Sequence, residues 1–148
     1  GRKWAVYEGG LRTPMIVRMP GRVLSGQVND APWYFPDVLP TLVALANATP
    51  PAMIDGQNVL PLLLGESDTF PERYFYWEFH ERGFDQAVRW KAWKGVRYGK
   101  EAPLGLYDLS EDIGESNDVS AQHPQIVQQL TTFLDSARTV FSYWPIDK

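Results

Sequence analysis

The sequence predicts an α+β chain in two parts. The end of a larger α/β domain, with a buried strand and a helix, precedes a small four-stranded antiparallel sheet that packs against a C-terminal amphipathic helix. Three patterns predict this: a short apolar run near residue 16, four aromatic-rich segments between residues 74 and 109, and a helical apolar period after Pro124. We divide the chain near residue 70, with residues 1–70 in the larger domain and residues 71–148 in the small one.

The first part is expected to contain a strand buried on both faces. Met15-Ile16-Val17 is a continuous apolar run with Pro14 before it and Pro20-Gly21 after it, which is typical of a central strand in an α/β sheet. No other segment looks like its neighbour in a sheet. We therefore expect this segment to be poorly ordered or to make the isolated chain self-associate, because an unpaired apolar strand is a template for association.

A largely apolar helix follows this strand. Asp37 is a good N-cap residue, Pro40 falls in the first turn, where a missing N–H costs little, and the apolar pattern ends near Asn47. A glycine turn at Asp55-Gly56 then leads to a short apolar stretch from Val59 to Leu64.

The second part has the pattern of an antiparallel sheet and one helix. Strands are rich in aromatic and β-branched residues, and four such segments are separated by turn residues: 74–79, 87–90, 93–98 and 104–109. The final helix begins at Pro124, a suitable first residue. Its apolar residues recur every three or four positions up to Phe141, so one of its faces should cover the sheet.

Composition excludes several classes of protein. The 148 residues carry a net charge of −4, which argues against a nucleic-acid partner, and there is no apolar run long enough to cross a bilayer. The absence of cysteine excludes disulfides, thiolate metal sites and a cysteine nucleophile within the chain. His80 and His123 are too far apart in sequence for a metal pair, so no metal site is expected. The chain begins at Gly1 without methionine, and we interpret it as a piece of a longer protein.

Residues 3–14, KWAVYEGGLRTP, resemble the signature of the sulfatase family, in which a lysine is followed five residues later by Glu-Gly-Gly and then by arginine and proline. Later segments are similar to that family in the same order: Ile16–Gly21, Asp37–Leu42, Asp55-Gly56 with Leu60–Leu63, Leu106–Leu109 and Gly114–Val119. The resemblance covers nearly the whole chain. It implies the C-terminal portion of a sulfatase with the alkaline-phosphatase-like fold.

The resemblance also implies groups that this chain does not carry. The nucleophile of the family is a formylglycine made from Cys or Ser in a Cys/Ser-x-Pro-x-Arg motif, and its calcium ligands lie upstream of the lysine motif. The chain has neither, so the isolated fragment is expected to hold no cofactor and to be inactive. Such sulfatases are usually exported, which makes a periplasmic or secreted location the expectation.

The resemblance gives Lys3 the role of sulfate binding and leaving-group stabilisation. Glu8, Gly9-Gly10 and Arg12 are interpreted as the scaffold of this loop, with the glycines providing a sharp turn and the two charged side chains pairing or bonding backbone groups nearby. His80, in the turn after the first strand of the sheet, is a candidate contact to the part of the substrate beyond the sulfate. The competing interpretation of His80 is an exposed turn residue without a role.

Two other functions remain open at this point. Trp77, Trp90, Trp93 and Tyr98 could form an aromatic platform of a carbohydrate-binding module, although packing in a small core is favoured. A phosphatase or phosphonate hydrolase on the same fold is the second alternative. The acidic residues Asp108, Glu111, Asp112 and Glu115 are interpreted as a solvated loop. The substrate of a sulfatase would be a sulfated small molecule or glycan.

Overall fold

The computed structural model describes residues 4–81 and 83–143, and these form two compact units. One unit joins residues 4–13 to the described part of the chain after Pro71, and the other comprises Pro14–Pro71. The change of unit after Pro71 lies close to the division at residue 70. Residues 4–13, however, belong to the unit of the small sheet. The assignment of residues 1–70 to a larger domain stays a prediction.

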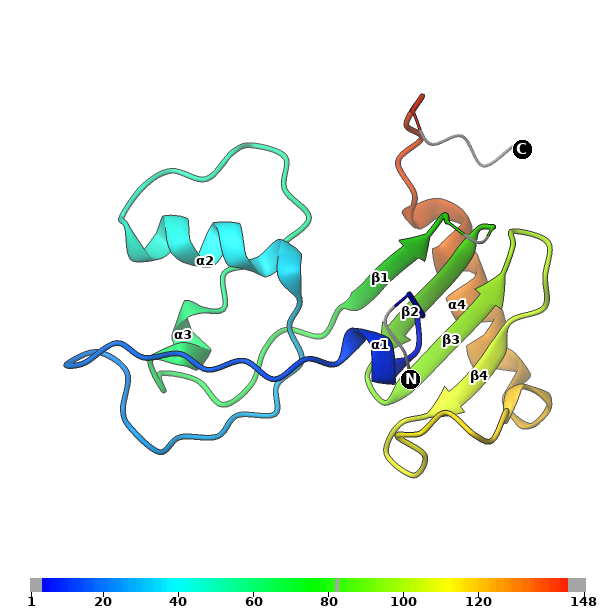
Figure 1. Cartoon of the computed structure of the whole chain (residues 1–148), viewed down its shortest axis with the longest axis horizontal. Helices are drawn as coiled ribbons and strands as arrows, with labels where there is room; N and C mark the ends of the chain where they lie inside the picture. Colours follow the sequence, from blue (N-terminus) through cyan, green and yellow to red (C-terminus); the bar gives the residue numbers. More distant parts are fainter. Residues whose placement is uncertain (1–3, 82, 144–148) are drawn as a thin grey trace. The chain divides into compact units, whose positions relative to one another are not determined.

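The sheet unit contains the predicted four-stranded antiparallel sheet (Figure 1). Its strands follow one another in sequence order, β1 (Tyr74–Phe79), β2 (Asp85–Trp90), β3 (Trp93–Tyr98) and β4 (Gly105–Asp108). Each strand pairs only with its neighbour in sequence, as expected where short turns connect the strands. This confirms the α+β architecture.

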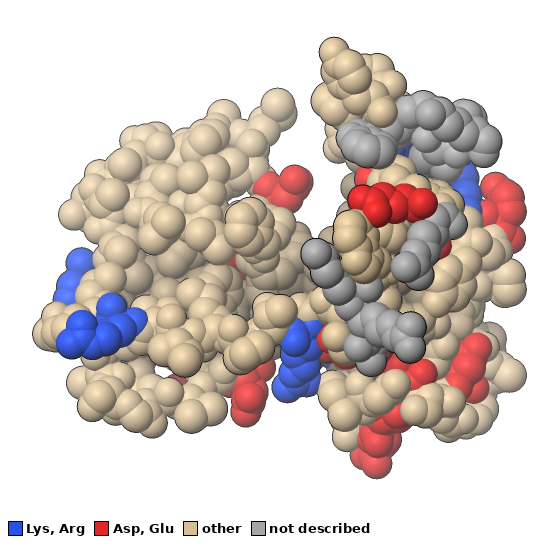
Figure 2. All heavy atoms as spheres, viewed as in Figure 1, with Lys and Arg blue, Asp and Glu red and all other residues tan. Residues whose placement is uncertain are grey.

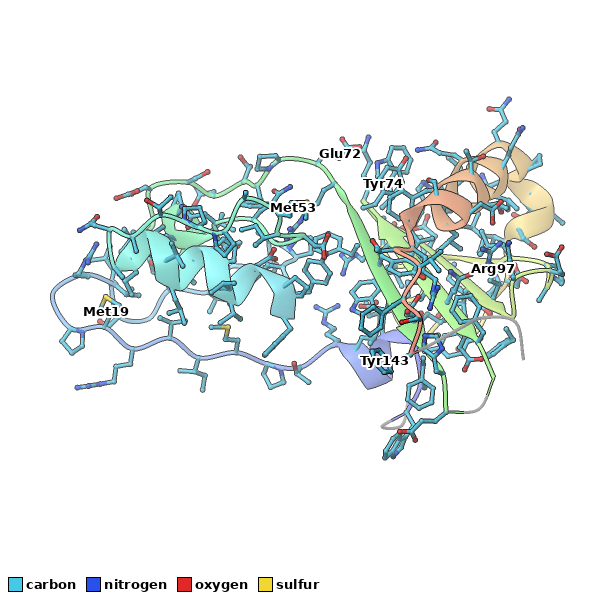
Figure 3. The ribbon with its side chains drawn as sticks, turned by 90° about the horizontal axis from the view of Figure 1, so that it is seen from above. Met19, Met53, Glu72, Tyr74, Arg97 and Tyr143 are labelled. Atoms are coloured by element: carbon cyan, nitrogen blue, oxygen red, sulfur yellow. The ribbon has the colours of Figure 1, made fainter. Side chains whose placement is uncertain are left out.

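One face of the sheet is covered by helix α4 (Pro124–Ala137), which begins at the predicted proline. Leu130 and Leu134 of this helix form a core with Val88 and Leu106 of the strands. Gly95 lies beneath the helix, and a Cβ atom there would come within 3.2 Å of Leu130. The absence of a side chain at this position therefore lets the helix pack closely on the sheet. Figure 3 shows Tyr74 and Arg97 on the side of the sheet that faces α4, where Tyr74 stacks on Phe133 and Arg97 pairs with Asp135.

The opposite face is covered by the N-terminal segment. Val6 is buried against Ala87 and Val96, and helix α1 (Glu8–Leu11) follows on the same face. The predicted sharp turn at Gly9-Gly10 is therefore wrong, because both glycines lie within this short helix. The strands alternate side chains between two covered faces, and this explains why aromatic residues fill both.

The second unit contains a 3₁₀ turn at Phe35–Asp37 and helices α2 (Val38–Leu45) and α3 (Leu60–Leu63). Met15–Val17 is not a strand here, and Ile16 is 93% exposed. The apolar pattern of a buried strand cannot form one alone, since each strand needs a hydrogen-bonded neighbour, and no described residue pairs with this segment.

Asp37 lies at the predicted N-cap position of α2, but its side chain makes no capping hydrogen bond to that helix. Its buried carboxylate accepts hydrogen bonds from the N–H groups of Tyr34 and Gln57, at 3.0 and 2.8 Å, instead of capping α2. Gly56 allows this arrangement, because a Cβ there would lie 1.9 Å from the carbonyl oxygen of Pro36. No helix in the described part of the chain is long and apolar enough to cross a bilayer.

Candidate functional site

The segment that follows Lys3 is fixed firmly to the sheet. Lys3 itself lies outside the described residues. From Trp4 onward, Val6 is buried against β2 and β3, and the Tyr7 ring packs against Tyr98 and Tyr107. Burial, together with hydrogen bonds among these tyrosines, raises the pKa of Tyr7 above its ordinary range. The phenol therefore stays neutral.

Glu8 of this segment reaches a buried charge cluster on the sheet. Its carboxylate accepts a hydrogen bond from Lys94 Nζ at 2.8 Å, and the Lys94 side chain is fully buried. Arg89 lies 3.7 Å from the other Glu8 oxygen. The Lys94 ammonium also lies 4.8 Å from the centre of the Trp77 ring, close enough for a cation–π contact. The expectation that Glu8 pairs nearby is confirmed, whereas the Arg12 side chain is exposed.

Glu115 completes the cluster from the loop after β4. Its Oε2 accepts a hydrogen bond from the backbone N–H of Glu8 at 2.6 Å, and its Oε1 lies 3.8 Å from Lys94 Nζ. The side chain is 2% exposed, so the prediction of a solvated acidic loop is wrong for Glu115, although it holds for Glu111. Burial raises the pKa of Glu115, and the Lys94 charge only partly opposes this.

A Trp4 contact lies at the end of β1. The Trp4 ring packs edge-on against Phe79, with 5.8 Å between ring centres. Trp4 also has a φ of 78°, a left-handed conformation that is strained for a bulky side chain. His80 follows Phe79 directly and begins the turn to β2. Trp4, through its contact with Phe79, and His80, which follows Phe79, therefore both lie at the end of β1.

His80 is held in place by a polar network on the α4 side of the sheet. Its Nε2 lies 3.0 Å from Glu78 Oε1, and its ring packs on Phe84. Glu78 also accepts hydrogen bonds from Tyr76 and Arg138, at 2.6 and 3.1 Å. The His80 side chain is 18% exposed. It is thus an oriented, partly accessible imidazole, not the freely exposed turn residue of the competing interpretation.

The aromatic residues of the sheet mainly fill its core. Trp90 and Trp93 pack beneath α4, and Trp77 packs beneath the N-terminal segment. Tyr98 is 59% exposed. The His123 ring rests on Trp93, at the N-cap position of α4. Packing thus accounts for the three tryptophans, as favoured from the sequence.

Sequence reasoning missed Lys94. The signal was present: strand alternation puts Lys94 on the same face as Val96, and a lysine on a covered face requires a buried anion. Among residues 4–81 and 83–143, no group of three or more His, Asp or Glu side chains could hold a metal ion.

Comparison with known proteins gives a consistent result. The sequence model of a family described as "N-sulphoglucosamine sulphohydrolase, C-terminal" matches residues 2–140. An N-acetylgalactosamine-6-O-sulfatase of Bacteroides thetaiotaomicron is 32% identical over 94% of this chain, which corresponds to 30% of that relative. The steryl-sulfatase of Homo sapiens is 36% identical over 93% of this chain and 29% of its own length.

A solved structure from Bacteroides thetaiotaomicron, described with the metabolism of multiple glycosaminoglycans, superposes with a TM-score of 0.78 at 31% identity. It covers 91% of this chain and 31% of its own. The chain therefore spans about a third of the length of the proteins it matches.

Proposed function

Because this chain belongs to the sulfatase family represented by the C-terminal region of N-sulphoglucosamine sulphohydrolase, we propose that it is the C-terminal part of an enzyme that hydrolyses sulfate esters. The observation that carries this proposal is the match over residues 2–140, which includes the Lys3–Pro14 motif. The anchoring of this motif on the sheet through Glu8 supports it. The named relatives are sulfatases, which favours this function over a phosphatase or a carbohydrate-binding module.

Lys3 is proposed as the catalytic residue that this chain supplies. A sulfate monoester carries a delocalised negative charge, and further charge develops on the bridging oxygen as the S–O bond breaks. A positioned ammonium stabilises this charge best where water is excluded. Lysine suits a point contact to one oxygen, without the fork geometry of arginine.

Calcium and formylglycine, which the family resemblance implies, do not fit on this chain. It contains no cysteine and no Ser-x-Pro-x-Arg motif, and the part that the structure describes offers no cluster of metal ligands. Both groups are proposed to belong to other residues of the full-length enzyme, and no step is assigned to them here.

We assign the end of the sheet at Trp4, Phe79 and His80 to one wall of the substrate pocket. Glu78 orients His80, and an imidazole can donate to or accept from a hydroxyl, which suits a contact to the substrate beyond the sulfate. The substrate class is a sulfated small molecule or glycan, and the name of the bacterial relative favours a sulfated sugar. A periplasmic or secreted location is part of the same proposal. On the face drawn in Figure 2, the Lys and Arg side chains are scattered and not gathered in one patch. The proposal includes no nucleic-acid partner, because the net charge of −4 is unfavourable to a phosphate backbone.

The direct test is Lys3→Ala in the full-length enzyme. We expect kcat/KM for a chromogenic aryl sulfate to fall by on the order of 10² or more, since removing one charge-stabilising donor typically costs that much. Lys3→Arg should restore little activity, because its wider head does not suit a point contact. Lys100→Ala, which removes an exposed lysine of the same chain, is the matched control. Near-normal activity of Lys3→Ala would refute the assignment.

The wall assigned to His80 has its own test. His80→Ala should raise KM for a sulfated sugar and leave a small aryl sulfate nearly unaffected, because the aryl substrate does not reach that wall. The neighbouring exposed residue gives the control Glu81→Ala. Equal losses on both substrates would indicate structural damage, and no loss on either would remove His80 from the pocket.

A further inference from the structure

Two motifs that are far apart in sequence form one structural unit. Glu8 belongs to the Lys3–Pro14 motif, and Glu115 belongs to the Gly114–Val119 segment, 107 residues later. They meet where Glu115 Oε2 accepts the backbone N–H of Glu8 at 2.6 Å, with Lys94 between the two carboxylates. The proposed function explains the first motif through Lys3 but gives no role to the second.

The loop that carries Glu115 is shaped to present this side chain. Asp112 Oδ2 accepts the backbone N–H groups of Ser116 and Asn117, at 2.6 and 2.8 Å. Glu115 itself has a φ of 52°, in the left-handed region. Asp118 Oδ1 accepts the N–H of Leu106 at 3.1 Å and so ties the end of the loop to β4. These hydrogen bonds fix the backbone of the loop on both sides of Glu115.

The contact from Glu115 acts on the backbone that follows Lys3. Glu8 is the first residue of α1, and such an N–H group has no partner within its own helix. The buried carboxylate supplies that partner. With Val6 buried on the strands and Trp4 on Phe79, this contact fixes the path of the chain from residue 4 to residue 8. The cluster therefore determines where the described chain after Lys3 runs.

We propose that Glu115 and Lys94 are positioning residues for the Lys3 loop. This inference rests on the proposed function of Lys3. Glu115 does not touch the substrate; it holds the Glu8 backbone, and through it the segment that carries the catalytic lysine. A misplacement of about 1 Å at a reacting group can reduce a rate by as much as 10²-fold. Loss of the Glu115 contact should therefore lower kcat, because it would misplace Lys3 during the chemical step.

The test is a double-mutant cycle in the full-length enzyme. Glu115→Ala should lower kcat by on the order of 10-fold, with a smaller change in KM. In a Lys3→Ala background the same substitution should have almost no further effect on kcat, because the residue whose position it controls is gone. Glu111→Gln, in the same loop and exposed, should leave kcat unchanged in both backgrounds.

Two conservative variants separate positioning from charge and from folding. Glu115→Gln keeps the length of the side chain and an oxygen that can accept the Glu8 N–H, so it should retain kcat within about threefold. Glu115→Asp keeps the charge, but its side chain is one methylene shorter and its oxygen no longer reaches the Glu8 N–H. It should therefore lower kcat about as much as Glu115→Ala. If Glu115→Ala does not fold, Glu115→Asp takes its place in the cycle.

Each alternative has a distinct outcome. If Glu115→Ala lowers kcat by the same factor with and without Lys3, or if Glu115→Asp is as active as Glu115→Gln, the positioning role is overturned. If Lys3→Ala alone is fully active, the proposed function of Lys3 fails. That result is read from a different enzyme variant, so the two failures are distinguishable.

Discussion

Replacing Lys94 with methionine tests whether the buried cluster holds the sheet unit together. The substitution keeps an unbranched side chain of similar length and removes only the ammonium. Lys94 is fully buried, and its two carboxylate partners are 6% and 2% exposed. Water therefore cannot replace the lost charge, and Glu8 and Glu115 would be left facing each other.

The size of the effect follows from this burial. Removing one partner of a buried ion pair typically destabilises a protein by about 3–5 kcal/mol. Arg89, 3.7 Å from Glu8, still offsets part of the loss, so we expect a value near 3 kcal/mol. The double variant Lys94→Met, Glu8→Gln removes the opposed charges together and should be less destabilised than the sum of its single variants, by roughly 1–3 kcal/mol.

The assay is urea unfolding of the chain followed by tryptophan fluorescence, which reports on the sheet because Trp77, Trp90 and Trp93 lie in its strands. Lys91→Met is the matched control. Lys91 pairs with Glu72, but both side chains are 52% exposed, so its loss should cost less than about 1 kcal/mol. If Lys94→Met is no more destabilising than Lys91→Met, the cluster does not stabilise the fold and this reasoning is wrong.

Three further results are expected. The 148-residue chain alone should not hydrolyse a chromogenic aryl sulfate with added calcium, because it has no cysteine and no Ser-x-Pro-x-Arg motif; turnover that survives repurification and disappears in Lys3→Ala would contradict this. Light scattering should show self-association through the exposed Met15–Val17 segment, and a strict monomer with that segment protected in hydrogen exchange would rule it out. Burial raises the pKa of Glu78, but hydrogen bonds from Tyr76 and His80 outweigh this effect and lower the pKa below 4.5. The ionised Glu78 therefore stabilises the fold above pH 4.5, and this stabilisation is lost as the pH falls through the lowered pKa. Glu78→Gln should therefore destabilise the chain by about 1–2 kcal/mol at pH ~7 and by much less once the pH has fallen below the lowered pKa, as measured by urea unfolding at a series of decreasing pH values. A difference that does not change with pH would argue against the shift.

The sequence alone determined the elements of the sheet unit. The aromatic segments predicted the four strands to within two residues at each end, and Pro124 predicted the first residue of α4, because such patterns are local and each reports on its own element. The helix ends at Ala137, four residues before Phe141, where the predicted apolar period ended. The Lys3–Pro14 motif likewise identified the family before any fold was known. The apolar run Met15–Val17 predicted a strand, but a strand requires a hydrogen-bonded partner strand, and none of the described residues provides one.

Only the tertiary structure decided how the charges are paired. Lys94 lies 86 residues after Glu8, and Glu115 lies 107 residues after Glu8. No spacing along the chain could therefore indicate that the three residues share one buried cluster. The structure also decided that Gly9 and Gly10 lie in a short helix, where an isolated glycine pair indicated a turn. In both cases the outcome depends on which surface covers the segment. A buried carboxylate and its cation are brought together by the packing of elements that are distant in sequence. Strand alternation could indicate that Lys94 needs a buried anion, but not which distant residues supply it.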